Sequence, residues 1–111
     1  MGFYPRRLVS GAQLTNSPAT YYTATNVKAR IDAATIRNDN STAETFSIWL
    51  VPTGGSADDT NQVIKDRSIA AGQSQIVPEI VGHYLEAGGT IQAVASNGSQ
   101  VNLIVSGGEI T

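Results

Sequence analysis

The sequence predicts an all-β protein: an antiparallel β-sandwich, jelly-roll-like, with an extended N-terminal arm. Roughly seven or eight short segments rich in β-branched and aromatic residues follow one another along the chain. Turn signals separate them about every ten residues, a spacing typical of sandwiches and barrels. No stretch has the period of an amphipathic helix, so crossover helices are not expected.

A chain of 111 residues is long enough for one domain with a modest hydrophobic core. Cysteine is absent, so neither disulfides nor thiolate chemistry are available. The N-terminus has no signal-peptide pattern, and no apolar run is long enough to span a membrane. We therefore expect a protein made in the cytoplasm that does not interact with membranes.

The most distinctive stretch is residues 44–51, ETFSIWLV, which PTGG follows at residues 52–55. In an extended strand Phe46, Ile48 and Leu50 fall on one face, and Trp49 and Val51 on the other. Apolar side chains on both faces predict a central strand, and Pro-Thr-Gly-Gly ends it with a turn.

Residues 1–19 show neither strand alternation nor a helical period, and Pro5, Gly11 and Pro18 interrupt them. We interpret them as an extended arm in front of a β-sandwich domain at residues 20–111. The arm is too apolar for a solvated tail, so it is expected to dock on its own domain or on a neighbour. Its candidate partner-binding residues are Phe3, Tyr4, Arg6, Arg7 and Leu8.

In chain order, the predicted strands, with the central one at residues 44–51, are residues 21–24, 27–37, 44–51, 62–69, 74–77, 90–96 and 100–106. Within 27–37 the alternation slips at Ala33–Ala34, which predicts a β-bulge or a second covered face. Pro78 predicts a strand end or an edge position. Residues 80–85 fit either an extended segment or a single helical turn.

Two turns predict hairpins. Residues 38–41, NDNS, lead into the central strand. Residues 97–99, NGS, lie between two alternating runs and give the strongest hairpin signal in the sequence.

Charge is unevenly distributed. Residues 1–40 carry five basic and two acidic side chains, whereas residues 41–111 carry two basic and seven acidic ones. Such polarity favours head-to-tail contact with copies of the same chain or with an acidic neighbour; a chance distribution of surface charge is the alternative. No basic run is dense enough to predict nucleic-acid binding.

Candidate reactive groups are few. His83 is the only histidine, and Glu79 would share a face with it only on a helix, which Pro78 disfavours. Asp58 and Asp59 lie in a polar loop but lack the spaced carboxylates of an EF-hand. We therefore expect no enzyme, no cofactor and no metal site.

Aromatic side chains suggest one further kind of site. Trp49 with Tyr21, Tyr22 and Tyr84 could form a platform for stacking sugars. These residues are scattered along the chain, so core packing is the simpler interpretation.

From about Tyr22 to the C-terminus the sequence resembles a group of small tailed-bacteriophage virion proteins. After that tyrosine, the shared motifs are ARIDAATIRN (29–38), WLVPTGG (49–55), IAAGQS (69–74), VGHYLEAGGTIQA (81–93) and VSGGEI (105–110). The resemblance covers about four-fifths of the chain and consists mainly of turn and core residues; residues 1–19 lie outside it.

The resemblance implies a virion structural protein, made in the host bacterial cytoplasm and present in many copies. The preferred role is a capsid decoration or cement protein that binds the major capsid protein, as a homo-oligomer for which we expect a trimer, with the arm on a neighbouring subunit. The alternatives are a neck, tail or head-fibre adaptor that binds other virion proteins, and a carbohydrate-binding attachment module.

Overall fold

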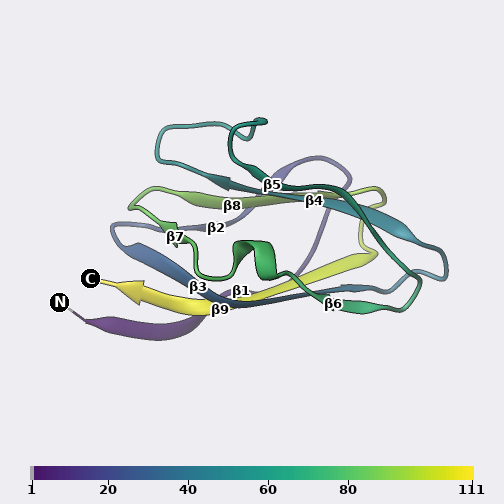
Figure 1. The fold of residues 1–111 in the computed structure, drawn as a ribbon, viewed down its shortest axis with the longest axis horizontal. Coiled ribbons are helices and arrows are strands. Elements are labelled where there is room, and N and C mark those ends of the chain that lie inside the picture. Colours follow the sequence, from purple (N-terminus) through teal and green to yellow (C-terminus); the bar gives the residue numbers. More distant parts are fainter. Residues whose placement is uncertain (1) are drawn as a thin grey trace.

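A computed structural model describes residues 2–111 and shows two antiparallel sheets packed face to face (Figure 1). Its elements are β1 (Phe3–Gln13), β2 (Ala19–Thr23), β3 (Lys28–Asn38), β4 (Glu44–Val51), β5 (Gln62–Ile69), β6 (Ser74–Ile76), the 3-10 helix η1 (Pro78–Ile80), β7 (Tyr84–Leu85), β8 (Thr90–Ala95) and β9 (Val101–Ile110). The predicted β-sandwich is confirmed. No helix in this part of the chain is long and apolar enough to cross a membrane.

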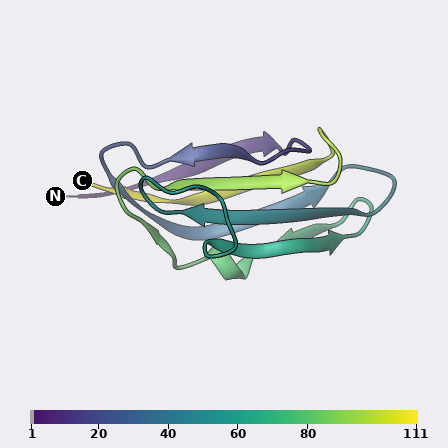
Figure 2. The same cartoon turned by 90° about the horizontal axis from the view of Figure 1, so that it is seen from above.

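The order of the strands is that of a jelly roll. Sheet A contains β1, β9, β3 and β6 in that order, with β7 also paired to β3; sheet B contains β2, β8, β4 and β5. When the two-residue β7 is left aside, the strands pair from the ends of the chain inward, as in a jelly roll. β1 pairs with β9, β2 with β8, β3 with β6 and β4 with β5. Figure 2 shows β1 and β2 along one long edge of the sandwich and β5 and β6 along the opposite edge.

The N-terminal segment differs from the sequence-based expectation. Instead of leaving the domain as an arm, it forms β1, which pairs with β9 from Phe3 to Gln13. Leu8 and Val9 are only 5% and 3% exposed and belong to the core. Register shifts at Leu8 and Gly11 place neighbouring residues on one face, which hides the strand alternation. Residues 3–13 are therefore a strand of the sandwich and not an arm outside it. Docking on the same molecule, one of the two placements expected for this segment, is what the structure shows, and residue 19 does not separate an arm from a domain.

Both predicted hairpins are instead connections between the two sheets. The NGS turn at residues 97–99 joins β8 of sheet B to β9 of sheet A, and residues 38–41 lead from β3 of sheet A to β4 of sheet B. Within residues 2–111, β4 and β5 are the one pair of consecutive strands that also pair with each other. Turn residues indicate where the chain reverses, but not which sheet it joins next.

The two strands with the clearest sequence signals behave as predicted. β4 has the predicted bounds and lies between β8 and β5 in the middle of sheet B. In β3 a register shift against β9 lies between Ile31 and Ala33, so the predicted bulge is confirmed. The bulge returns Ala34 and Ile36 to the buried face after Asp32 and Ala33 have both faced outward.

The core fills the space between the sheets. Its fully buried members include Ala29, Ile31 and Ile36 of β3, Val101, Leu103 and Val105 of β9, Phe46 and Ile48 of β4, and Ile91 and Ala93 of β8. Alternation along each strand sends these side chains inward and the polar ones outward. Packing two apolar faces is what holds the sandwich together.

A hydrogen bond links the two sheets near the chain termini. Glu109 of sheet A accepts a bond from the Tyr22 hydroxyl of sheet B at 2.6 Å, and Arg6 binds the same carboxylate at 3.0 Å. The bond from Tyr22, followed by that from Arg6, lowers the pKa of Glu109. Burial and this bond raise the pKa of Tyr22, so the phenol stays protonated as a donor.

A buried carboxylate marks the opposite end of the sandwich. Glu44 is 2% exposed and accepts hydrogen bonds from the Ser96 hydroxyl and from the side-chain amides of Asn97 (3.0 Å) and Asn40 (2.6 Å). These bonds, that from Ser96 first, lower the pKa of Glu44. The carboxylate thereby ties together the two loops that cross between the sheets at this end.

Candidate interaction surface

One long edge of the sandwich is closed by an irregular segment, residues 74–86, in place of a full strand. β6 stops before Pro78, which cannot donate to a β-ladder, and η1 follows. Gly82 then takes a left-handed φ of 88°, which favours glycine, and the chain returns to β3 as β7. Hydrogen bonds from the Val77 amide to the Ala34 carbonyl (3.0 Å) and from the Gly82 amide to the Ile31 carbonyl (2.7 Å) hold the segment on β3.

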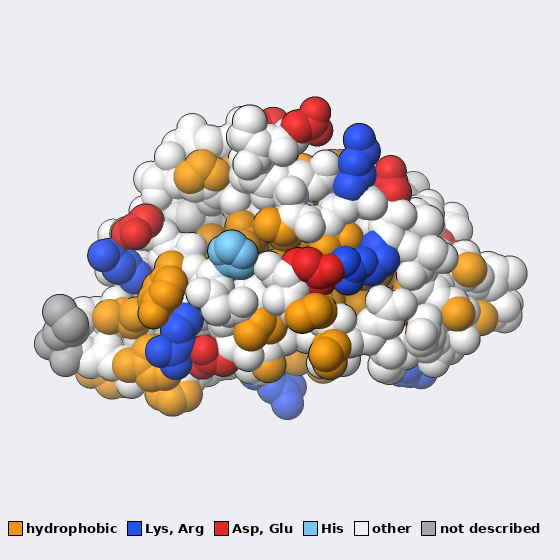
Figure 3. Space-filling model, in the orientation of Figure 1, with side chains coloured by type: hydrophobic (Ala, Val, Ile, Leu, Met, Phe, Trp, Pro, Cys, Tyr) orange, Lys and Arg blue, Asp and Glu red, His pale blue; other side chains and the backbone are white. Residues whose placement is uncertain are grey.

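This segment leaves apolar side chains in solvent. Ile76, Val81 and Tyr84, which we call the edge patch, are 73%, 43% and 58% exposed. Their neighbours in the chain are the buried anchors Val77, Ile80 and Leu85. Figure 3 views this edge, and hydrophobic side chains lie on both sides of the single histidine. Tyr84 lies opposite Arg30 and Ile76 lies opposite Thr35, so the three side chains are spread along one edge. Apolar side chains exposed on one part of a surface are typical of interaction sites.

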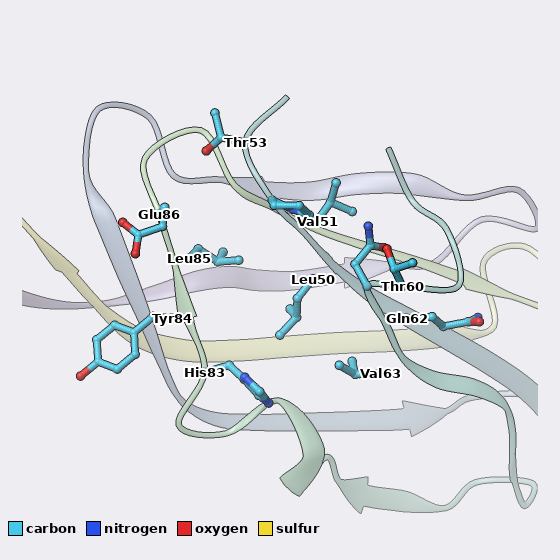
Figure 4. A pocket seen from close by; sticks show the side chains of 12 residues that line it. Leu50, Val51, Thr53, Thr60, Gln62, Val63, His83, Tyr84, Leu85 and Glu86 are labelled. Carbon is cyan, nitrogen blue, oxygen red and sulfur yellow. The ribbon is translucent and has the colours of Figure 1, made fainter. Parts of the chain in front are cut away.

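A cleft of about 610 Å³ adjoins the edge patch, where the two sheets separate. Leu50 and Val63 of sheet B form one wall, and residues 83–86 form the other. Figure 4 shows that the side chains of Leu50 and Leu85 point into the space between the sheets, whereas the Tyr84 ring points away from it. The cleft is therefore apolar inside and polar at its rim.

Two titratable side chains apart from tyrosine, His83 and Glu86, lie at the rim of the cleft. Glu86 pairs with Lys28 at 3.5 Å, and both side chains are exposed. His83 has Thr60 and Asn61 across the cleft, and Glu86 is the one carboxylate among the described residues that line it. Within residues 2–111 no three His, Asp, Glu or Cys side chains lie close enough to hold a metal ion. The apolar lining of the cleft suits the burial of an apolar side chain.

An ion pair crosses the same edge. Arg67 of β5 in sheet B binds Glu79 of η1, which lies on the side of sheet A. The Arg67 guanidinium lowers the pKa of the Glu79 carboxyl. Glu79 is therefore engaged by Arg67 and not by His83, and the pair fixes η1 to the neighbouring sheet.

The five predicted partner-binding residues occupy different environments. Leu8 is a core residue, so it is not available to a partner in the folded protein. The Phe3 ring covers Gly108 and lies 4.2 Å from the Arg30 guanidinium, so part of it is already used within the chain.

The other three predicted partner residues remain at the surface. Arg6 pairs with Glu109 at 3.0 Å. Tyr4 is 59% exposed, and Arg7 has no carboxylate partner within residues 2–111. Binding of a partner by these residues stays a prediction.

The candidate sugar platform is not assembled. Tyr22 is buried in the core, Trp49 lies in sheet B, and Tyr84 lies at the edge of sheet A. Tyr21 uses its hydroxyl to accept a bond from the Thr15 amide at 3.0 Å. The four rings therefore do not share one face, and a stacking surface would need them to.

The acidic loop is organised by its own hydrogen bonds. The Asp58 carboxylate accepts bonds from the Thr60 amide (2.8 Å) and hydroxyl (2.5 Å), which lower its pKa. Asn61 closes the loop by donating to the Ser56 carbonyl at 2.9 Å. Asp58 thus acts as a turn residue, and among the described residues it is not joined by enough further acids to make a cation site.

Sequence reasoning missed the edge patch. Its signal was present in the run IVPEIV at residues 76–81, which is apolar on both sides of a proline. A proline-broken run is too short to bury all its side chains on one sheet, so some must face solvent.

Fold and surface together define a small jelly-roll domain with an exposed apolar edge. No protein-family profile matches the sequence, and a search of curated proteins finds no match. Among solved structures, the chain is similar to a chain in the structure of the infectious bursal disease virus Gx strain, with 16% sequence identity and a TM-score of 0.47. The likeness covers 97% of this chain and 30% of the length of that one.

Proposed function

We propose that this chain is a non-enzymatic virion structural protein of a tailed bacteriophage, namely a capsid decoration or cement protein that binds and stabilises the major capsid protein shell. The observation that carries the proposal is the exposed edge patch on a rigid sandwich. Ile76, Val81 and Tyr84 are 73%, 43% and 58% exposed along one edge, and exposed apolar surface of this kind is what a protein that docks on another presents.

The sequence resemblance and the edge patch overlap in part. The motif VGHYLEAGGTIQA at residues 81–93 supplies Val81 and Tyr84 to the edge patch, whereas Ile76 lies between two of the shared motifs. In a decoration protein this edge would lie against capsid subunits, and the sandwich would bridge them. Each contact can be weak, because a repetitive lattice and several linked copies add avidity.

A neck, tail or head-fibre adaptor would use the same kind of surface on another virion protein. Copy number separates the two roles, because a decoration protein follows the number of capsid subunits and an adaptor does not. Mass spectrometry of purified particles, with labelled peptides as standards, measures it. A copy number that tracks the major capsid protein supports decoration, a few copies to a few tens support an adaptor, and absence from the particle refutes a virion role.

The surface itself is tested by binding to particles that lack the protein. Ile76→Asp and Val81→Asp place charges on the edge patch and are expected to weaken attachment at least about tenfold. Thr20→Asp is the matched control, because Thr20 is exposed on the outer face of sheet B. Equal binding by all three variants would place the attachment surface elsewhere.

A further inference from the structure

The two long edges of the sandwich carry opposite charge. β1, at one edge, contains Arg6 and Arg7 and no acidic residue. The opposite edge comprises the loop after β4, strand β5 and residues 74–86. It carries the acids Asp58, Asp59, Asp66, Glu79 and Glu86 against the bases Lys65 and Arg67. Figure 2 shows these edges on opposite sides of the molecule.

Part of this charge is unpaired within the chain. Across residues 2–111, Arg7 at one edge has no carboxylate partner. At the other edge Asp58, Asp59 and Asp66 have no basic partner and Lys65 has no acidic one, so the unpaired charge there is negative on balance. Complementary unpaired charges on opposite edges attract two copies of the chain in one relative orientation.

The apolar groups are complementary in the same way. Tyr4, on the edge strand β1, is 59% exposed. The opposite edge has the cleft of about 610 Å³ with Leu50, Val63 and Leu85 inside. A cleft of this size accepts an aromatic ring, and tyrosine suits an interface with an apolar interior and a polar rim. The loop that carries Asp58 and Asp59 also lines this cleft, through Thr60.

Strand addition does not offer an alternative contact at β1. Pro5 lacks an amide hydrogen, and the bulges at Leu8 and Gly11 bend the strand. These features block the continuous pairing of a further strand, so a contact at this edge depends on side chains.

We propose that the protein associates head to tail with a second copy of itself, the β1 edge of one molecule against the cleft edge of the next. Tyr4 enters the cleft, and Arg7 faces Asp58 and Asp59 at its rim. The β1 edge and the cleft edge are different surfaces, so the contact is heterologous. Repeating such a contact builds either a closed ring or a filament. The contact uses the cleft interior, whereas the proposed attachment to a particle uses the outward-facing Ile76 and Val81, so different variants test the two proposals.

Sedimentation velocity over a range of protein concentrations tests the proposal. The wild type is expected to form species larger than the 11.6 kDa monomer, and about 0.5 M salt is expected to weaken them because it screens the charges. Tyr4→Ser and Arg7→Glu are each expected to weaken association at least about tenfold, and Asp59→Arg is expected to restore it in the Arg7→Glu background.

Two matched controls lie between the edges on the outer face of sheet A. Ile104→Ser removes a partly exposed apolar side chain, and Arg37→Glu reverses a charge that Asp39 already pairs. Both are expected to associate like the wild type. Circular dichroism checks that every variant is folded. A folded wild type that stays monomeric, or an oligomer that Tyr4→Ser and Arg7→Glu leave unchanged, would overturn the proposal.

Discussion

Replacing Leu8 by alanine tests whether the N-terminal segment is a strand of the fold or an arm. Leu8 is 5% exposed in the core and lies at a bulge of β1. Removing a buried leucine side chain and leaving a cavity costs about 2–5 kcal/mol. Arg7→Ala, one residue away and exposed, is expected to stay within about 0.5 kcal/mol of the wild type.

Removing residues 2–13 makes the same test more severe. The loss of the buried Leu8 and Val9 side chains alone costs about 3–6 kcal/mol, and the flank of β9 is exposed as well. A domain of this kind is stable by only about 5–15 kcal/mol, so the truncated chain is expected to lose cooperative unfolding or to unfold at much lower urea.

Urea denaturation followed by circular dichroism and by fluorescence of Trp49, the only tryptophan, measures both effects. The strand interpretation fails if Leu8→Ala matches Arg7→Ala within error. It also fails if the truncated chain unfolds cooperatively at the midpoint of the wild type, because residues 2–13 would then be dispensable, as an arm is.

Three other substitutions test the central strands and the two carboxylates. Gly107→Ala is expected to lower the free energy of unfolding, measured by urea denaturation, by about 3 kcal/mol or more. A Cβ there would overlap the Arg30 carbonyl oxygen and force β9 away from β3. A variant as stable as the wild type would contradict this close approach. Tyr22→Phe removes the bond to Glu109 between the sheets and is expected to cost about 1–3 kcal/mol; ultraviolet titration should also show that the wild type has one more late-ionising tyrosine than the variant. The pKa of Glu44 in the folded protein lies below the ordinary value of 4.5. The hydrogen-bonded carboxylate therefore adds to the free energy of unfolding above pH 4.5, and this addition is lost as the pH falls through the pKa of the folded state. Thermal unfolding of Glu44→Gln should therefore depend less on pH than that of the wild type below about pH 4.5, and parallel curves would show that this carboxylate is not responsible.

The sequence predicts most strands because one side of each strand is buried. The bounds of β4 and β5 match the prediction, because each is a run of β-prone residues with turn residues at its ends, namely PTGG at residues 52–55 after β4 and Asn61 before β5. The bulge in β3 was also predictable, because one extra residue in a strand shifts the inward-facing positions by one, as the slip in alternation at Ala33 does.

β1 was not predictable from alternation. Its only buried residues near the middle, Leu8 and Val9, are neighbours, and two bulges interrupt the period of two. The sequence also did not reveal that β8 and β9 pair with other strands and not with each other. An Asn-Gly turn favours a tight reversal, but which sheet the next strand joins depends on burial of both faces, a non-local property.

The candidate site was the least predictable part. The edge patch and its cleft bring together Leu50, Val63 and residues 76–86, which are distant in the sequence and meet only once both sheets are packed. Ile76 is exposed because it pairs with Thr35, whose side chain also faces outward from sheet A, and that pairing is not visible in the sequence.

The place of β9 has a consequence for how the protein is made. β9 is the strand between β1 and β3, so sheet A has a gap in its middle until residues 101–110 have left the ribosome. While all the intervening strands are being synthesised, β1 has no strand to pair with, and Leu8 and Val9 stay exposed to solvent. Contacts of such long sequence separation must also overcome the entropy of closing a loop of nearly the whole chain. The nascent chain is therefore expected to fold late and in a single step, and to depend on chaperones when its synthesis is slowed.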